Sequence, residues 1–334
     1  MLSHFVEVRV KIMENKIKNP LVLERADPWV YRHQDGFYYF TGSVPGYQTI
    51  ELRRAKNLND LQTGEVKTIW QAHKEGPQSK LIWAPEIHWL QGKWYIYYAA
   101  SNDLELRDNQ HGHRMFVLEN SNPDPFTGEW VEKGQVQTAF NSFSLDATVF
   151  ENQGKYFYVW AQQDPHIPGN SNLYLSEMAN PWTLTGPQIL LSIPEYAWEQ
   201  VGFMVNEGPA VIKKGNKLFL TYSASATDEN YAMGLLWADA HANLLDPYSW
   251  HKEAQPVFVS SEENHQYGPG HNSFTTLADG SDVLVYHARP KKNDFADPLN
   301  NPDRHARAQV FTWNEAGFPV FGSPVADNEA LLRK

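Results

Sequence analysis

NEGPAVIKKGNKLFLTYSAS, residues 206–225, is the stretch that decides the fold. It begins with an acidic segment around Glu207 and continues to a turn at Lys214-Gly215-Asn216. A run of strand-forming residues, Leu218 to Tyr222, follows the turn. A β-branched and aromatic run behind a Gly-containing turn is typical of a hairpin. The stretch therefore predicts a strand, a tight turn and a second strand.

The chain repeats this pattern five times. Such a regular period indicates one supersecondary unit repeated along the chain. Units of about four strands that repeat radially form the blades of a propeller. We therefore predict an all-β fold, a five-bladed β-propeller in a single domain. The turn glycines are Gly36, Gly92, Gly154, Gly215 and Gly280, at steps of 56, 62, 61 and 65 residues.

Each repeat also carries a polar residue 6 to 9 positions before its turn glycine. Equivalent positions of radially repeated blades converge on one axis, so these side chains are expected to meet. Charges gathered in a low-dielectric interior are costly and usually functional. Glu86 lies nearest to its turn, out of register with the other acids, which favours a supporting role for it. The five residues are Asp27, Glu86, Asp146, Glu207 and His271.

Length and composition are consistent with one large domain. The chain has 334 residues, of which 42% are hydrophobic, and all-β folds of this length often form one domain. We expect the propeller to occupy residues 21–334. Residues 1–20 precede the first repeat and contain an alternating segment, 5–10. They are expected either to complete the last blade or to form a disordered lead-in.

Charge and cysteine usage exclude several classes of function. The net charge of −11 argues against nucleic acid and against an anionic membrane as partners. There is no cysteine, which excludes disulfides and thiol chemistry. No apolar run approaches the roughly 18 residues of a membrane span, and the N-terminus lacks the apolar core of a secretory signal. We therefore expect a cytoplasmic protein, and a homo-oligomer is left open.

Several single residues have two readings. Trp83 lies just before Glu86, where it fits either the core or the wall of a site for a ring. His271 is either a satisfied buried histidine or part of a metal or water network. Arg289 ends a strand near the predicted axis and is suited to orienting hydroxyls or pairing with a carboxylate. His111 and His113 lack an acidic third partner, so a solvated loop is favoured over a metal site.

Carboxylates at the mouth of a channel suit hydrolysis of a glycosidic bond. The inverting route needs a general acid on the leaving oxygen and a general base on a water across the sugar ring. The two groups need different pKa values, and a third carboxylate raises that of the acid by repulsion. Asp27, Asp146 and Glu207 supply three carboxylates, and blades one and four are suitably opposed.

Six short motifs, in this order and blade register, resemble glycoside hydrolase family 43. The resemblance covers about residues 20 to 325. It implies a five-bladed propeller that acts as an inverting arabinofuranosidase, β-xylosidase or endo-arabinanase. The motifs are Ala26-Asp27-Pro28, Trp83-Ala84-Pro85-Glu86, Ser144-Leu145-Asp146-Ala147, Asn206-Glu207-Gly208-Pro209, Gly270-His271-Asn272-Ser273 and Arg289.

The resemblance implies a role for each site residue. Asp27 would be the general base, Asp146 the group that raises the pKa of the acid and orients it, and Glu207 the general acid. Trp83 and Arg289 would hold the terminal sugar. No cofactor is needed for the chemistry. His271 would be the axial histidine, which in many members of the family binds a structural calcium or sodium ion, largely through waters.

Two stretches point to a branch of the family. Residues 46–55 and 297–307 are similar to single-domain, exo-acting α-L-arabinofuranosidases that trim arabino-oligosaccharides. The expected substrate is therefore an arabinose-containing oligosaccharide, with α-1,5 linkages favoured. A β-xylosidase or endo-arabinanase of the same family is the alternative. A non-catalytic sugar-binding propeller is a more remote one, because all three carboxylates are retained.

Overall fold

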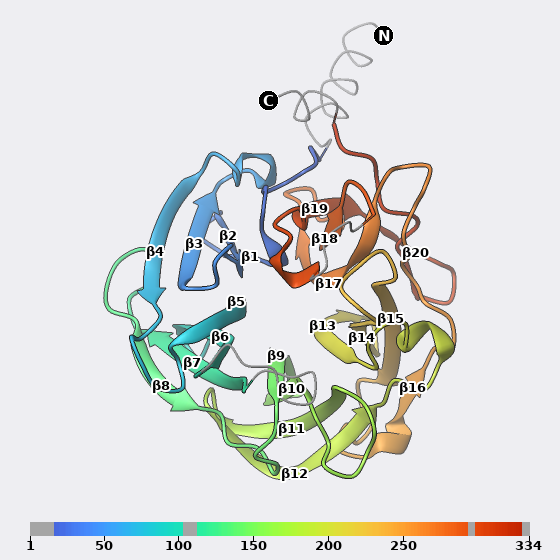
Figure 1. The fold of residues 1–334 in the computed structure, drawn as a ribbon, viewed down its shortest axis with the longest axis horizontal. Helices are drawn as coiled ribbons and strands as arrows, with labels where there is room; N and C mark the ends of the chain where they lie inside the picture. Colours follow the sequence, from blue (N-terminus) through green and yellow to red (C-terminus); the bar gives the residue numbers. More distant parts are fainter. Residues whose placement is uncertain (1–16, 103–111, 293–297, 329–334) are drawn as a thin grey trace, which may run out of the picture.

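The computed structural model describes residues 17–102, 112–292 and 298–328. Within these ranges the chain forms β-strands and short 3-10 turns, with no α-helix (Figure 1). Five sheets are arranged around a central axis, so the predicted five-bladed β-propeller is confirmed. The alternating segment at residues 5–10 lies outside the described residues. No helix in the described ranges is long and apolar enough to cross a bilayer.

The first three blades are four-stranded antiparallel sheets whose strands follow chain order from the axis outward (Figure 1). A short 3-10 turn, η1 (Leu58–Asp60), connects the outer strands of blade one. The strands are β1 (Ala26–Arg32), β2 (Tyr38–Ser43), β3 (Thr49–Ala55) and β4 (Glu65–Gln71); β5 (Lys80–Leu90), β6 (Lys93–Ser101), β7 (Arg114–Asn120) and β8 (Val131–Gln135); and β9 (Ser144–Asn152), β10 (Lys155–Gln162), β11 (Asn172–Asn180) and β12 (Thr183–Ser192).

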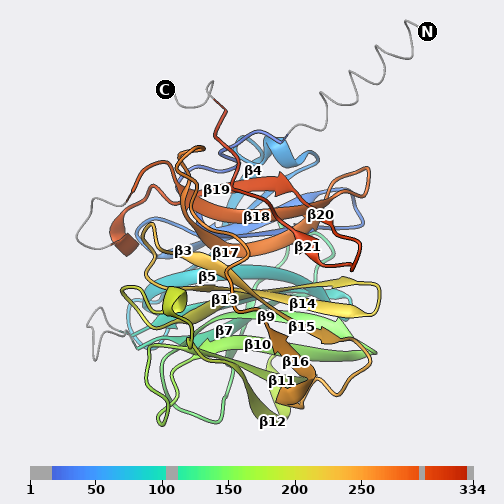
Figure 2. The ribbon, with the colours of Figure 1, turned by 90° about the vertical axis from the view of Figure 1, so that its right-hand side faces the viewer.

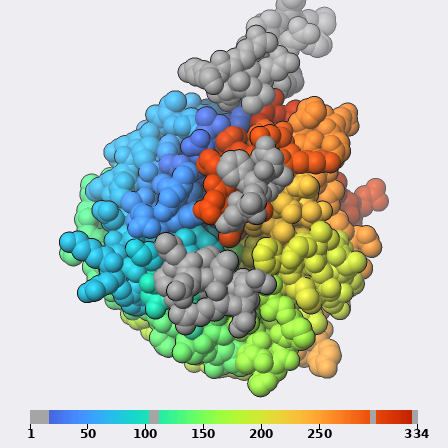
Figure 3. Space-filling view, in the orientation of Figure 1, coloured from blue at the N-terminus to red at the C-terminus, as the bar shows by residue number. Residues whose placement is uncertain are grey.

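The last two blades complete the ring, and a small two-stranded sheet follows them. Figure 2 shows the sheets of successive blades packed on one another from the side, and Figure 3 shows by colour that consecutive blades are neighbours around the face. The elements are η2 (Ala197–Glu199), β13 (Asn206–Lys214), β14 (Lys217–Ala224), β15 (Ala232–Asp239), η3 (Pro247–Ser249) and β16 (Trp250–Lys252); β17 (Tyr267–Thr276), β18 (Asp282–Arg289), η4 (Pro298–Asn300) and β19 (His305–Val310); and β20 (Thr312–Trp313) with β21 (Pro319–Val320).

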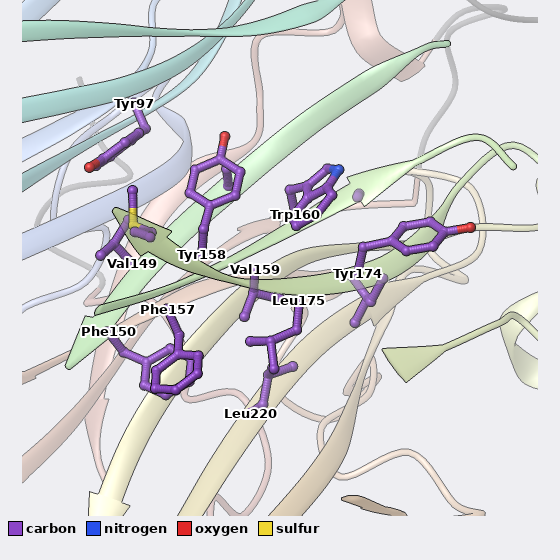
Figure 4. Close-up of a cluster of buried hydrophobic side chains, with 14 of the residues drawn as sticks. Tyr97, Val149, Phe150, Phe157, Tyr158, Val159, Trp160, Tyr174, Leu175 and Leu220 are labelled. Atoms are coloured by element: carbon purple, nitrogen blue, oxygen red, sulfur yellow. The ribbon is translucent and has the colours of Figure 1, made fainter. Parts of the chain in front are cut away.

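Aromatic and aliphatic side chains fill the space between blades. One cluster joins Tyr97 of blade two, Trp160 of blade three and Leu220 of blade four, all fully buried (Figure 4). β-Branched and aromatic residues suit such half-covered pleated surfaces. The aromatic residues of this cluster therefore serve packing between blades.

The segment before the first blade is attached to the last one. The backbone N–H of Leu21 donates to the carbonyl of Ala306 at 2.7 Å, and Val22 bridges the same residue of β19. The side chain of Asn19 both accepts from and donates to the backbone of Ala308, at 2.9 and 2.8 Å. The two ends of the propeller are thus joined through residues 19–22. The boundary between lead-in and propeller at residue 20 stays a prediction.

The first strand of every blade contains a bulge that repeats around the axis. In each strand the pairing register shifts over two residues, and the first of the two has a positive φ. Only a few per cent of non-glycine residues have positive φ, and such strain clusters at functional sites. The five bulge residues are Asp27 (φ 55), Ala84 (φ 44), Asp146 (φ 51), Gly208 (φ 54) and His271 (φ 43).

Candidate active site

The bulges refine the register expected from the sequence. Asp27, Asp146 and His271 occupy the same bulge position in blades one, three and five. Glu207 stands one residue before the bulge of blade four. Glu86 stands two residues beyond the bulge of blade two, so it is not equivalent to the others. The five polar residues therefore do not share one position, although four of them fall within one residue of it.

Asp27 is buried among donors. Ser43 donates its hydroxyl to Oδ2 at 2.5 Å, and Nη1 of Arg304 lies 3.5 Å from Oδ1. Nδ1 of His271 is 3.3 Å from the same oxygen, and the Asp27 backbone N–H donates to Nδ1 of His287 at 3.1 Å. Burial alone would raise the pKa of Asp27, but the charges of His271 and Arg304 hold it well below its ordinary value. Asp27 is therefore ionised at neutral pH.

Glu207 has the opposite protonation state. Burial, followed by the negative charge of Asp146, raises the pKa of Glu207 to about 8. The Tyr231 hydroxyl donates to its Oε1 at 2.8 Å. The residue as a whole is only partly buried. Glu207 therefore carries a proton at neutral pH.

The pKa of Asp146 lies between those of Asp27 and Glu207. Its Oδ2 accepts from the backbone N–H of Gly208 at 3.1 Å and lies 3.7 Å from Nδ1 of His271. Burial and the charge of Asp27 raise the pKa of Asp146 to about 6, although His271 opposes the change. Its hydrogen bond to the residue after Glu207 fixes the backbone next to the proposed acid.

His271 lies among carboxylates. Burial would lower its pKa, but Asp146 and Asp27 outweigh burial and raise it to about 10. A protonated imidazole has no free lone pair for a metal. Within the described ranges, no group of three or more His, Cys, Asp or Glu side chains could hold a metal ion. In this state Nδ1 of His271 faces the two carboxylates, and the axial ion near His271 stays a prediction.

Glu86 lies in the interior, and the supporting role that its spacing suggested stays a prediction. Its side chain is buried, and its Oε2 lies 3.0 Å from Nε2 of His88. Burial raises the pKa of Glu86 well above its ordinary value. The same cause lowers the pKa of His88 to about 3. His88 is therefore neutral, and burial favours the neutral form of Glu86 as well, because an isolated charge in the interior would be costly.

Trp83 occupies the position before the bulge of blade two, the one that Glu207 occupies in blade four. It is half-buried, and its ring stacks on His113 with centroids 3.9 Å apart. Tyr47 approaches it edge-on at 6.0 Å. Trp83 lies on the inner strand of its blade, and these two aromatic neighbours hold its ring in place. His113 serves this packing, and His111 lies outside the described residues.

Arg289 forms hydrogen bonds to the backbone of two loops. It is buried, donates to the carbonyls of Thr227 at 3.0 Å and Pro298 at 2.6 Å, and forms an ion pair with Asp303. The arginine that reaches Asp27 is Arg304. The carboxylate that Arg289 pairs with is thus Asp303 rather than one of the three predicted site acids. The role of Arg289 in holding a sugar stays a prediction.

Arg304, Tyr47 and Ser43 line a pocket of about 60 Å³ next to Asp27. A pocket of this volume holds a few waters. Sequence reasoning missed Arg304, His287 and Tyr231 as neighbours of the acids. Arg304 and His287 stand in motifs that the sequence displays, Asp303-Arg304-His305 and Tyr286-His287-Ala288. No signal in the sequence marks Tyr231, because it contacts Glu207 from a separate loop.

The site thus combines an ionised carboxylate on blade one with a protonated one on blade four. These are the states that a general base and a general acid need before reaction. Carboxylates with pKa values driven apart, at the inner strands of a propeller, define an acid–base hydrolase.

A family model places the protein more closely. The model described as "Glycosyl hydrolases family 43" matches residues 17–319, so the chain belongs to this family.

Named relatives agree with this assignment. The chain is 52% identical over 316 residues to an "Extracellular exo-alpha-(1->5)-L-arabinofuranosidase" of Streptomyces avermitilis, covering 94% of this chain and 65% of the relative. It is 55% identical over 282 residues to a protein of the same name from Streptomyces chartreusis, covering 84% and 85%. A crystal structure of an α-L-arabinofuranosidase from Lactobacillus brevis superposes with a TM-score of 0.92 at 54% identity, covering 93% and 98%.

These relatives correct one expectation. Both Streptomyces proteins are named extracellular, so the cytoplasmic location expected from the sequence is wrong. The expectation rested on an N-terminal segment without an apolar core and on the absence of cysteine, and neither feature determines where a protein works. The chain spans 65% of the length of the Streptomyces avermitilis relative.

Proposed function

We propose that this protein is an exo-acting, inverting α-L-arabinofuranosidase that releases terminal units from α-1,5-linked arabino-oligosaccharides. The observation that carries the proposal is the pair of opposite protonation states, with Asp27 ionised and Glu207 protonated on different blades. The names of the relatives support the choice of sugar.

In this mechanism a water molecule attacks the anomeric carbon. Asp27 accepts a proton from that water as the new C–O bond forms. Glu207 gives its proton to the glycosidic oxygen as the bond to the leaving group breaks. Burial and the negative charge of Asp146 keep Glu207 protonated beforehand. Exchange with solvent then returns the proton from Asp27 to Glu207. Attack from the face opposite the leaving group inverts the configuration.

The position of the sugar is part of the same proposal. Trp83, held by His113 and Tyr47, offers an aromatic wall on an inner strand. Arg304 and Ser43 surround the base with donors. Arg289 would contribute through the two loops that it joins. Oligomeric state stays a prediction, as does the lack of nucleic-acid or membrane partners.

The axial ion is proposed with a separate test. An ion held through water near His271 would be structural, because the two proton transfers above need only carboxyl groups. We therefore expect dialysis against a chelator to leave the kcat on an aryl arabinofuranoside unchanged. A loss of activity restored by calcium would contradict this expectation.

NMR analysis of products tests the proposed function. During hydrolysis of a linear α-1,5-arabino-oligosaccharide, we expect early release of β-L-arabinose one unit at a time. Early α-anomer would mean retention and would overturn the roles of Asp27 and Glu207. Early release of short oligosaccharides would indicate an endo-arabinanase. Turnover of xylo-oligosaccharides alone would indicate a β-xylosidase.

A further inference from the structure

Tyr231 connects the two halves of the site. It precedes β15 in the loop after β14, and its side chain is buried at 1% exposure. The hydroxyl donates to Oε1 of Glu207 at 2.8 Å. The ring lies nearly parallel to that of His287, with a centroid distance of 5.5 Å and an angle of 9°. The Tyr231 side chain therefore contacts Glu207 through its hydroxyl and His287 of blade five through the face of its ring.

His287 carries the connection on to Asp27. It lies on β18, is buried, and accepts the backbone N–H of Asp27 on Nδ1 at 3.1 Å. Burial lowers the pKa of His287 to about 3, so the ring is neutral and Nδ1 can accept. Asp27 has a positive φ of 55°, and a hydrogen bond to its N–H helps to hold this uncommon conformation.

The fold makes room for the Tyr231 ring. A Cβ on Gly270 would lie 2.5 Å from Cε1 of Tyr231, closer than real carbon contacts allow. The ring therefore lies directly against the backbone of β17, one residue before His271. The loop of Tyr231 is held as well, because Arg289 donates to the carbonyl of Thr227 in that loop. A side chain this confined has one orientation.

The hydroxyl of Tyr231 decides which oxygen of Glu207 carries the proton. A donor at Oε1 disfavours a proton on that oxygen, so the proton is carried by Oε2. The same bond favours the ionised carboxylate and thus opposes burial and Asp146. Other charged groups that act on Glu207 are Asp27 and His271. Arg304 interacts electrostatically with the Tyr231 hydroxyl.

We propose that Tyr231 is a positioning residue that orients the proton of Glu207 and, through its stack on His287, steadies the backbone of Asp27. The inference rests on the proposed function, because it needs Glu207 as acid and Asp27 as base. It adds a physical link between two groups that lie on separate blades.

Tyr231→Phe tests the hydroxyl. This change keeps the ring and removes one oxygen. We expect kcat on an α-1,5-arabino-oligosaccharide to fall about tenfold or more, with KM changed less than about twofold. On an aryl arabinofuranoside with a good leaving group the loss should be only about two- to threefold, because protonation then matters less. The alkaline limb of the kcat profile should move to higher pH, because the bond that favours ionised Glu207 is lost.

Tyr158→Phe is the matched control. Tyr158 is equally buried, and its hydroxyl has no hydrogen-bond partner among the described residues. Its removal should change neither the ratio of the two activities nor the alkaline limb. Tyr231→Leu tests the stack on His287. It should lower turnover of the aryl substrate below that of Tyr231→Phe, because activation of water by Asp27 is needed whatever the leaving group.

The outcomes separate this inference from the proposed function. If Glu207→Ala loses equal activity on both substrates, Glu207 is not the acid and both proposals fail. If Glu207→Ala spares the aryl substrate but Tyr231→Phe matches the wild type, the role of the hydroxyl is overturned alone. If Tyr231→Phe loses equal activity on both substrates, melts at a lower temperature and keeps the alkaline limb of the wild-type kcat profile, then Tyr231 serves only packing. Equal aryl activity in Tyr231→Leu and Tyr231→Phe would overturn the link to His287.

Discussion

Asp27 and Asp146 show how neighbours decide what a residue does. Both are buried aspartates at the same bulge position of their blades. The pKa of Asp27 is lowered because Arg304 and His271 both lie near its carboxylate. The pKa of Asp146 is raised to about 6 because burial and the charge of Asp27 prevail there. Residue type and backbone position alone do not distinguish a base from a group that tunes an acid.

The charge of Asp146 should set the alkaline limit of activity. Activity needs protonated Glu207, so kcat should fall as pH rises through its pKa of about 8. Asp146→Asn removes a negative charge that raises this pKa, so the fall should begin about one pH unit lower. A kcat profile against pH measures the change.

Asp279→Asn is the control for this prediction, because it removes the same charge from an exposed turn. Its alkaline limb should match that of the wild type. If the limb of Asp146→Asn also stays in place, then Asp146 does not tune Glu207.

Single residues also mark what the sequence could not predict. The repeat identified Asp27, Asp146, Glu207 and His271 as neighbours, because each precedes a recognisable hairpin turn. It could not tell which arginine beside the loop of residues 290–304 reaches the site. Arg289 precedes that stretch and Arg304 ends it, and no pattern in the sequence indicates that Arg304 is the one that contacts Asp27.

At the scale of the strand, the bulge is the element that builds the site. A regular strand alternates its side chains between two faces, whereas a bulge re-aims one of them. The bulge residue of blade two lies 8 residues before its turn glycine (92 − 84), as in blade three (154 − 146), so Glu86 is out of register because it stands two residues after the bulge residue. In blade two Ala84 occupies the bulge position. Because its side chain is apolar, a search for polar residues before each turn does not find it.

Gly208 is the one glycine among the five bulge residues. A Cβ there would lie 3.0 Å from Cγ of His271. We expect Gly208→Ala to displace His271 and to lower kcat at least tenfold, because His271 holds Asp27 and Asp146 in place. Steady-state kinetics together with a thermal melt would measure both effects.

Gly92→Ala separates crowding from backbone strain. Gly92 has a φ of 78° with no atom within 4 Å of an added Cβ. This control should lose about 1–2 kcal/mol of stability from the left-handed backbone and keep its kcat. Equal kcat values in the two variants would show that the contact with His271 is unimportant.

For the whole molecule, the sequence was a good guide because the fold is a repeat. Each glycine turn has the positive φ that its position requires, as at Gly36 and Gly154, so local chemistry and global period agree. The way in which the last blade joins the start of the propeller was less predictable. It depends on contacts such as Asn19 with Ala308, 289 residues apart, which no local pattern reveals.

Closure of the ring should contribute measurably to stability. Asn19 is buried and satisfies both backbone groups of Ala308. Asn19→Ala would leave these groups without partners, at a cost of about 2–4 kcal/mol. We expect a Tm lower by several degrees in calorimetry.

Asn59→Ala provides the comparison, because Asn59 makes a similar bond, to the N–H of Lys18, in an exposed place. Its Tm should change by about a degree or less. Equal shifts in the two variants would mean that the contact between Asn19 and Ala308 does not hold the ring together.

The bulge that recurs in every blade has a further consequence. The same backbone distortion carries an acid in two blades, a histidine in one, and alanine or glycine in the others. The bulge therefore forms with side chains of very different chemistry, and replacing one of them could alter the reaction without changing the fold. Ala84 is the bulge position with an apolar side chain, where a substitution could add a functional group beside the central axis.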